Sequence, residues 1–146
     1  ATELVSRMVE HHLRPSQMAP HGELPTARAI YRYYRDAGDA AIDNLYLNLA
    51  DYLAARGPDL SDRDLAEHCC TIRHILDRRA GPEAQERLPR LIDGHDIINN
   101  LCLEPGPQIG RLLDLVGEAQ ASGEIASRDD AIHLIKAAVS SGDSGA

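Results

Sequence analysis

The stretch DAAIDNLYLNLADYLAARG, residues 39–57, decides the fold class of this 146-residue chain. Its apolar side chains recur at helical spacing and so share one face of a helix. This stripe consists of Ile42, Leu45, Leu49, Tyr52 and Leu53. We expect Asp39 to cap the helix, Gly57 and Pro58 to end it, and the helix itself to be central to the fold.

The flanking sequence repeats the helical pattern. We expect an opening helix that stops before Pro15, followed by a loop rich in Pro over residues 15–25. The stretch TARAIYRYYRDAG then predicts a helix that is capped by Thr26 and closed by Gly38. Further helices are predicted after Ser61, near Asp96, from Pro107 and after Ser127, followed by a disordered Gly/Ser tail over residues 140–146. No strand-like alternation occurs, so the fold class is all-α, a bundle of about six to eight helices.

Charge limits the classes of function. The formal net charge of -8 argues against indiscriminate binding of nucleic acid, because sequence-independent affinity for phosphate comes from summed positive charge. A local basic face is still compatible with this negative net charge. Residues 1–56 hold 6 basic and 7 acidic side chains, and residues 57–146 hold 9 and 16. We therefore expect an internal boundary near residues 57–60.

The chain contains no run of 18 apolar residues and no signal-peptide pattern, so we expect no association with a membrane. Cys69, Cys70 and Cys102 have neither CxxC nor Cys/His ligand spacing, and we expect them to be reduced and the protein to be cytoplasmic. The first residues read as the later half of a helix already packed on something. We therefore expect the chain to be part of a longer protein.

Histidines and aspartates are the candidate metal ligands. His12 lies near a helix end, His21 in the loop and Asp51 on the long helix, so folding can bring them together as a His/Asp metal site. Spacing alone favours surface histidines and a solvated aspartate. His95-Asp96 looks like a dipeptide of metal phosphohydrolases, but no suitable partner histidines precede it. A helix cap at Asp96 explains the pair more simply.

Other catalytic chemistry has little support in the sequence. There is no GxSxG motif, and Cys69 and Cys70 lie mid-helix among apolar residues, where thiols are usually buried and inert. The glycines at 106 and 110 have neither the lysine nor the strand of a nucleotide-binding loop. We therefore expect no catalytic residue in this chain.

A basic helix face is the stronger candidate site. Arg28, Arg32 and Arg35 are spaced i, i+4 and i+7 and therefore share one face. Tyr31 and Tyr34 lie between them. Such a face can grip an RNA backbone through guanidinium–phosphate pairs, with tyrosines stacked on bases. The alternative is a solvated face whose arginines pair with the aspartates at 36, 39 or 43.

The segment LIDGHDIINNLCLEPGPQIGRLLDLVGEAQASGEIASRDDAIHLI, residues 91–135, resembles the C-terminal signature of bacterial CCA-adding enzymes and related poly(A) polymerases. The matching motifs are G-x-D at Gly94 and Asp96, L-x-P-G-P-x-I-G-x-L-L from Leu103, E-A-Q-x-x-G-E-I from Glu118, and S-R-D-D-A from Ser127. The Pro105-Gly106-Pro107 turn predicts a helix that starts at Pro107, and Gly110 predicts a close approach to a neighbouring helix.

Upstream, LVSRMVEHHLRP, ARAIYRYYRDAG and LYLNLADYLAARGP resemble the latter half of the HD-type helical region that often accompanies these enzymes. The resemblance implies that residues 1–58 belong to this region, and that His12 and Asp51 are part of an incomplete metal site. It implies that residues 59–139 form a C-terminal RNA-holding tail. The leading histidine, the His-Asp pair and the catalytic head of the family would lie before residue 1.

In this family such tails help to hold the tRNA body while the head adds nucleotides to its 3′ end. The resemblance thus implies a chain that lacks a catalytic site and binds tRNA or another RNA 3′ end. The phosphate contacts are expected from Arg28, Arg32, Arg35, Arg111 and Arg128. We expect no cofactor in this chain, and Mg2+ or another divalent metal in the parent. Two alternatives remain open: part of an HD-type metal-dependent phosphohydrolase acting on nucleotides, and a structural or homodimerising helical module.

Overall fold

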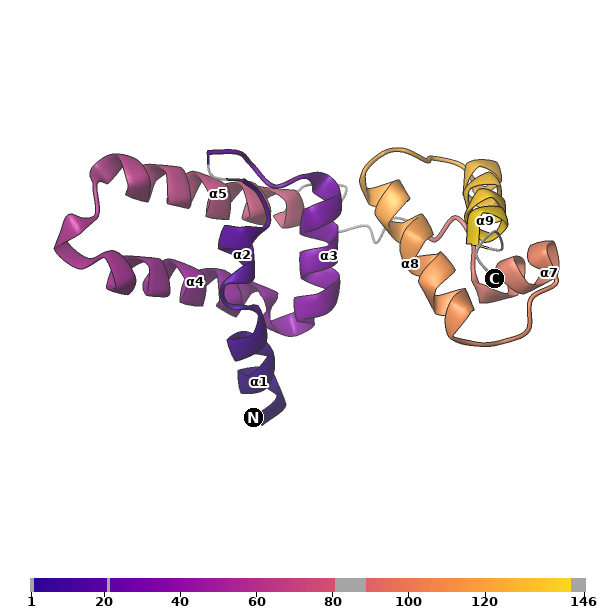
Figure 1. The fold of residues 1–146 in the computed structure, drawn as a ribbon, viewed down its shortest axis with the longest axis horizontal. Coiled ribbons are helices and arrows are strands. Elements are labelled where there is room, and N and C mark those ends of the chain that lie inside the picture. Colours follow the sequence, from indigo (N-terminus) through magenta and orange to yellow (C-terminus); the bar gives the residue numbers. More distant parts are fainter. Residues whose placement is uncertain (1, 21, 81–88, 143–146) are drawn as a thin grey trace. The chain divides into compact units, whose positions relative to one another are not determined.

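A computed structural model describes residues 2–20, 22–80 and 89–142, and these residues form helices and no strand. The predicted all-α fold is therefore confirmed. Contacts divide the chain into two compact units, residues 1–85 and residues 86–146. Each unit has its own hydrophobic core, and the two are described separately (Figure 1).

The first unit is built around a long helical hairpin. Its helices are α1 (Thr2–His11), α2 (Arg14–Gln17), α3 (Ala27–Ala37), α4 (Ala41–Arg56) and α5 (Asp62–Ala80), with short 3-10 turns η1 (Gly38–Ala40) and η2 (Gly57–Asp59). In Figure 1, α4 and α5 lie side by side and are joined through η2, while α3 packs on both. Helices α1 and α2 also contact α4, so α4 is the central helix, as predicted.

The buried face of α4 differs from the predicted apolar stripe. Leu45 is buried, but Leu53 is 42% exposed. Asn48, which is not part of the predicted stripe, is buried. The Asn48 amide nitrogen donates to the backbone oxygen of His12 at 2.8 Å and to the Ser16 hydroxyl at 2.9 Å. These bonds satisfy the buried amide and tie α4 to the segment between α1 and α2.

The second unit consists of α7 (Gly94–Leu101), α8 (Pro107–Ala121) and α9 (Arg128–Gly142), which pack on one another in pairs. Its core contains Ile92, Ile97, Ile109, Leu112, Val116, Ala119, Ile125, Ala131 and Ile135. Pro107 lies in the first turn of α8, as its turn motif predicted. None of the described helices is long and apolar enough to cross a membrane.

The change in charge near residues 57–60 does not separate the two compact units. Gly57 ends α4 with a φ of 51°, as predicted, but the chain then turns back and α5 packs on α4. The Tyr52 hydroxyl donates to the backbone oxygen of Asp64 at 3.3 Å across this hairpin. Because α4 and α5 pack together, residues 1–85 form one unit.

Two local predictions in the first unit were wrong. Residues 15–25 do not form a continuous loop, because Pro15 lies buried in the first turn of α2, where the missing N–H costs nothing. Asp39 does not cap the long helix. It lies in η1, and the residue that precedes α4 is Ala40, which has no capping side chain.

Three further differences concern the second unit. The cap of α7 is Asp93, whose carboxylate accepts from the backbone N–H of Asp96 at 2.8 Å; Asp96 is the partner that completes the capping box. Gly110 is exposed, and a Cβ there would meet no atom within 4 Å, so no close approach requires a glycine. Residues 140–142 continue α9, and the remainder of the predicted tail lies outside the described residues.

Candidate nucleic-acid interface

Helix α3 presents its arginines on the side opposite its buried face. Thr26 caps the helix by accepting a hydrogen bond from the backbone N–H of Ala29 at 3.2 Å, as predicted. The buried residues are Ile30, Tyr33 and Ala37. Because an α-helix turns about 100° per residue, Arg28, Arg32 and Arg35 fall on the opposite side of the axis. Arg32 and Arg35 are exposed and Arg28 is half-buried.

Tyrosine hydroxyls hold this helix against its neighbours. The Tyr33 hydroxyl donates to the backbone oxygen of Ala41 at 2.6 Å, and burial raises the pKa of Tyr33, which keeps it a neutral donor. The Tyr34 hydroxyl donates to the backbone oxygen of Ile75 on α5 at 2.9 Å. Tyr34 is thus engaged within the unit rather than presented for stacking on a base.

An acidic residue lies at the end of the arginine face. The Arg35 Nε atom is 2.8 Å from one carboxylate oxygen of Asp36, and an Arg14 guanidinium nitrogen from α2 is 2.7 Å from the other. Burial raises the pKa of Asp36, but hydrogen bonds from Arg35 and Arg14 outweigh it and hold the pKa below its usual value. The pairing of the arginine face with Asp36, which the alternative interpretation predicted, is therefore present for Arg35.

The charge on α3 distinguishes it from the other described helices. It carries three arginines against one aspartate, whereas α5 carries as many acidic as basic side chains. Among the helices in the described parts of the chain, α3 has the largest excess of positive side chains. The formal net charge of the whole chain is -8, so the positive excess on α3 is a local exception to it.

The other two predicted phosphate contacts belong to the second unit. Arg111 is exposed on α8. Arg128, at the start of α9, donates to a carboxylate oxygen of Asp96 at 2.5 Å, while the other oxygen of Asp96 accepts from the backbone N–H of Asp93 at 3.0 Å. Arg128 therefore ties the first turn of α9 to the capping box of α7.

The predicted metal ligands lie on neighbouring elements of the first unit. A ring nitrogen of His12 is 2.7 Å from the backbone oxygen of Val9, and Asp51 is exposed on α4, about one turn beyond Asn48. Within residues 2–20, 22–80 and 89–142, no three His, Cys, Asp or Glu side chains come together as a metal site. His21 lies outside the described residues. A metal at His12 and Asp51 stays a prediction.

Cys69 and Cys70 are not buried, contrary to the prediction. Cys69 and Cys70 are exposed on α5, as is Cys102 after α7. Ile72 and Ile75 of the same helix pack with residues of α3 and α4, and Cys69 and Cys70 lie on the outer side of the helix.

Comparison with known proteins identifies relatives of one kind. The chain is 35% identical to an A-adding tRNA nucleotidyltransferase from Deinococcus radiodurans over 89 residues, which are 61% of this chain and 20% of that protein. It is 30% identical to a CC-adding tRNA nucleotidyltransferase from Thermus thermophilus over 132 residues, 88% of this chain and 26% of that protein. Its curated homologues are tRNA nucleotidyltransferases. These homologues match the family whose signature residues 91–135 resemble.

The chain spans about a fifth of the first relative and about a quarter of the second. No family model and no solved structure matches it. The homology to tRNA nucleotidyltransferases therefore bears on a limited part of those proteins.

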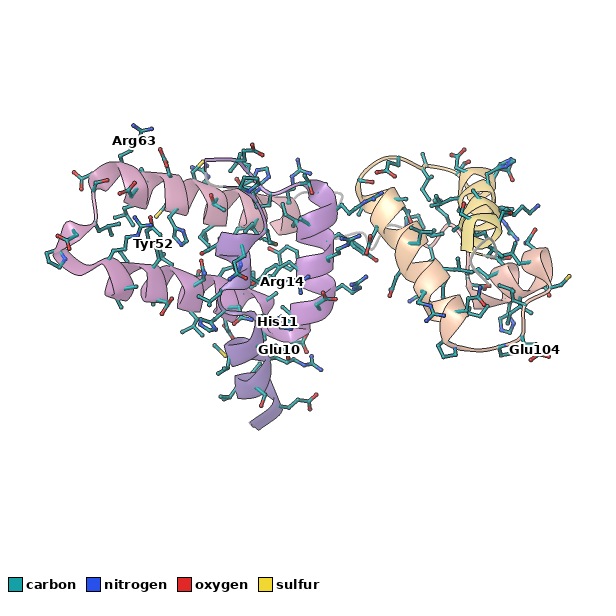
Figure 2. All side chains as sticks on the ribbon, viewed as in Figure 1. Glu10, His11, Arg14, Tyr52, Arg63 and Glu104 are labelled. Carbon is teal, nitrogen blue, oxygen red and sulfur yellow. The ribbon has the colours of Figure 1, made fainter. Side chains whose placement is uncertain are left out.

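Arg14 is the residue of this surface that the sequence did not indicate. It lies just before Pro15, where the sequence predicted the end of the opening helix, and no sequence pattern nearby pairs it with Asp36. The contact depends on how α2 packs beside α3. Figure 2 labels Arg14 on α2, within the first unit.

Proposed function

We propose that this chain binds tRNA and holds it for nucleotide addition at its 3′ end, with the face of Arg28, Arg32 and Arg35 on the phosphate backbone. The observation that carries the proposal is the position of these arginines opposite the buried face of α3, the most positive of the described helices. The curated relatives are named for tRNA, which supports this choice of nucleic acid. Arg111 and Arg128 are additional phosphate contacts in this proposal.

Nucleotide addition itself, and the divalent metal it uses, belong in this proposal to other parts of the full-length protein. The chain covers 20% and 26% of its two relatives, and none of the motifs for nucleotide binding lies in it. Its role is to position the RNA, for which guanidinium groups are suited because they form forked hydrogen bonds with phosphate.

Binding of labelled tRNA across a salt series tests the proposal. The chain should bind tRNA more tightly than an unrelated duplex of equal length, and the affinity should fall as salt rises because phosphate contacts release counterions. The combined variant Arg28→Glu, Arg32→Glu, Arg35→Glu should lose roughly tenfold or more in affinity and show a shallower salt dependence.

The matched control carries the same change in charge on another helix. Arg63, Arg73 and Arg78 are exposed on α5, and their replacement by glutamate changes the net charge equally. If the two triple variants lose the same affinity, binding reflects overall charge and the α3 face has no special role. Equal affinity of the α3 variant and the wild-type chain would also contradict the proposal.

A second candidate function is a helical module that associates with another copy of itself. The observation in its favour is the exposure of apolar side chains on α1, where Val5 is 57% and Val9 is 63% exposed. Sedimentation across a range of concentrations should then show a dimer that is weakened by Val5→Ser and Val9→Ser. A monomer at all concentrations would eliminate this candidate.

A further inference from the structure

The apolar surface of α1 is wider than the part that the first unit covers. Helix α1 packs on α3 and α4, and its Met8 is half-buried. Val5 and Val9 are four residues apart and therefore lie on one face of the helix, where they are 57% and 63% exposed. Leu4, which precedes Val5, is 43% exposed. Figure 1 shows α1 at the edge of the first unit, with its N-terminal end extending past α4.

The second unit has no comparable surface. Within residues 89–142 no large apolar side chain is exposed. In the described part of the chain, the large apolar side chains that are exposed all belong to the first unit: Leu4, Val5, Val9, Leu13, Leu24, Tyr46 and Leu53. They are most concentrated on α1, and exposed apolar surface of this kind marks a place where a partner packs.

We infer that the face formed by Leu4, Val5 and Val9, here the α1 face, is covered in the full-length protein by an amphipathic helix from another part of the same polypeptide. Such a helix would present apolar side chains at i, i+3, i+4 and i+7 towards the two valines. This inference does not depend on RNA binding. It assigns to an intramolecular partner the face that a second copy would otherwise use.

The length of the relatives supports a partner within the same polypeptide. The matched regions make up 20% and 26% of the two tRNA nucleotidyltransferases, so about three quarters or more of each relative lies outside them. A protein of that length has ample further polypeptide to supply a covering helix. An apolar helix face that is exposed in a part of such a protein is normally buried in the whole, because its burial contributes to folding.

The small size of the α1 face also favours a tethered partner over a separate one. Helix α1 has ten residues, so it is about 15 Å long and, with its side chains, about 10 Å across. One face of such a helix spans on the order of 150 Å². Even twice that area is far below the roughly 800 Å² that each partner buries in a stable association of separate proteins. A helix of the same polypeptide is held at high effective concentration, so a smaller apolar contact is enough.

The test compares the reactivity of a thiol at position 9 in the 146-residue chain and in the full-length protein. Val9→Cys introduces a side chain of similar size, and a maleimide is the label. Mass spectrometry identifies each modified peptide, because Cys69, Cys70 and Cys102 are exposed and react as well. The introduced thiol should react readily in the 146-residue chain. In the full-length protein it should react roughly tenfold more slowly or less, because the covering helix must first move away.

Leu24→Cys is the matched control. Leu24 is 47% exposed between α2 and α3, outside the α1 face, and its replacement should react at similar rates in both proteins. If the thiol of Val9→Cys reacts as fast in the full-length protein as in the 146-residue chain, the inference is wrong. Should Val9→Cys prevent folding of the full-length protein, carbene footprinting of the two wild-type proteins gives the same comparison at Val5 and Val9. Equal labelling there would likewise overturn it.

A second copy is the other occupant that these measurements can detect. In that case the thiol of Val9→Cys would become protected in the 146-residue chain alone as its concentration rises, and sedimentation would show a dimer. That result would overturn the inference and assign the α1 face to self-association. Protection that appears only in the full-length protein, and does not change with its concentration, is the expected result.

Discussion

At the scale of single residues, His68 is the group whose protonation should change packing. Its ring stacks in parallel on that of Tyr52 with centroids 3.9 Å apart, and the side chain is 8% exposed. Within the described residues its Nε2 atom has no hydrogen-bond partner, and the Arg56 guanidinium lies 4.8 Å from the centre of the Tyr52 ring. Burial, and then the charge of Arg56, lower the pKa of His68.

The lowered pKa sets the direction of a pH effect. Folded His68 binds a proton less readily than the unfolded chain does, so its contribution to stability is complete above an unfolded pKa of about 6.5 and declines below it. The fall in melting temperature between about pH 7.5 and about pH 5.5 should be smaller in His68→Phe, which keeps a stacked ring, than in the wild-type chain. His133→Phe, at an exposed histidine of α9, should leave the fall unchanged. An equal fall in all three proteins would contradict this assignment.

At the scale of elements, helix starts are where side chains set the structure most directly. The Thr26, Ser61 and Ser127 hydroxyls each accept a hydrogen bond from a backbone N–H three residues on, as predicted. At α7 the sequence predicted a cap at Asp96, whereas the residue with the extended backbone of an N-cap is Asp93. Backbone hydrogen bonds from Asp96 and His95 lower the pKa of Asp93. As pH falls through this lowered pKa, the Asp93 carboxylate takes up a proton and the cap should weaken.

This cap can be tested by substitution. Asp93→Ala should lower the melting temperature of the chain at neutral pH, because the first N–H groups of α7 lose their acceptor. Asp129→Ala, in the first turn of α9 but outside its capping position, should have a smaller effect. The reverse order would show that charge near a helix start matters more than the capping bond.

At the scale of the whole molecule, the described residues form two hydrophobic cores that share no residue. One contains Tyr33, Leu45 and Ile75 in the first unit, and the other contains Ile97 and Ile135 in the second. Ile97→Ala should destabilise the second unit by about 2–5 kcal/mol, because it leaves a cavity at a fully buried site. Hydrogen exchange should accelerate in α7, α8 and α9 while protection in α4 and α5 stays the same. Equal acceleration in both units would show that they unfold as one.

Much of the fold was predictable because the forces involved are local. Apolar periodicity, a capping hydroxyl and a glycine at a positive φ act within one or two turns, so most helices, the arginine face of α3 and the turn at Gly57 could be recognised. Asn48 was missed because its burial depends on acceptors contributed by another segment.

The sequence by itself determined that this protein is helical, where most of its helices begin and end, and that its homologues are tRNA nucleotidyltransferases. Only the tertiary structure decided that the units divide at residues 85 and 86, that Arg14 and Arg35 share Asp36, and that Arg128 reaches the capping box of α7. The physical reason is distance along the chain. Periodicity and capping act between residues a few positions apart, whereas these contacts join residues that only helix packing brings together.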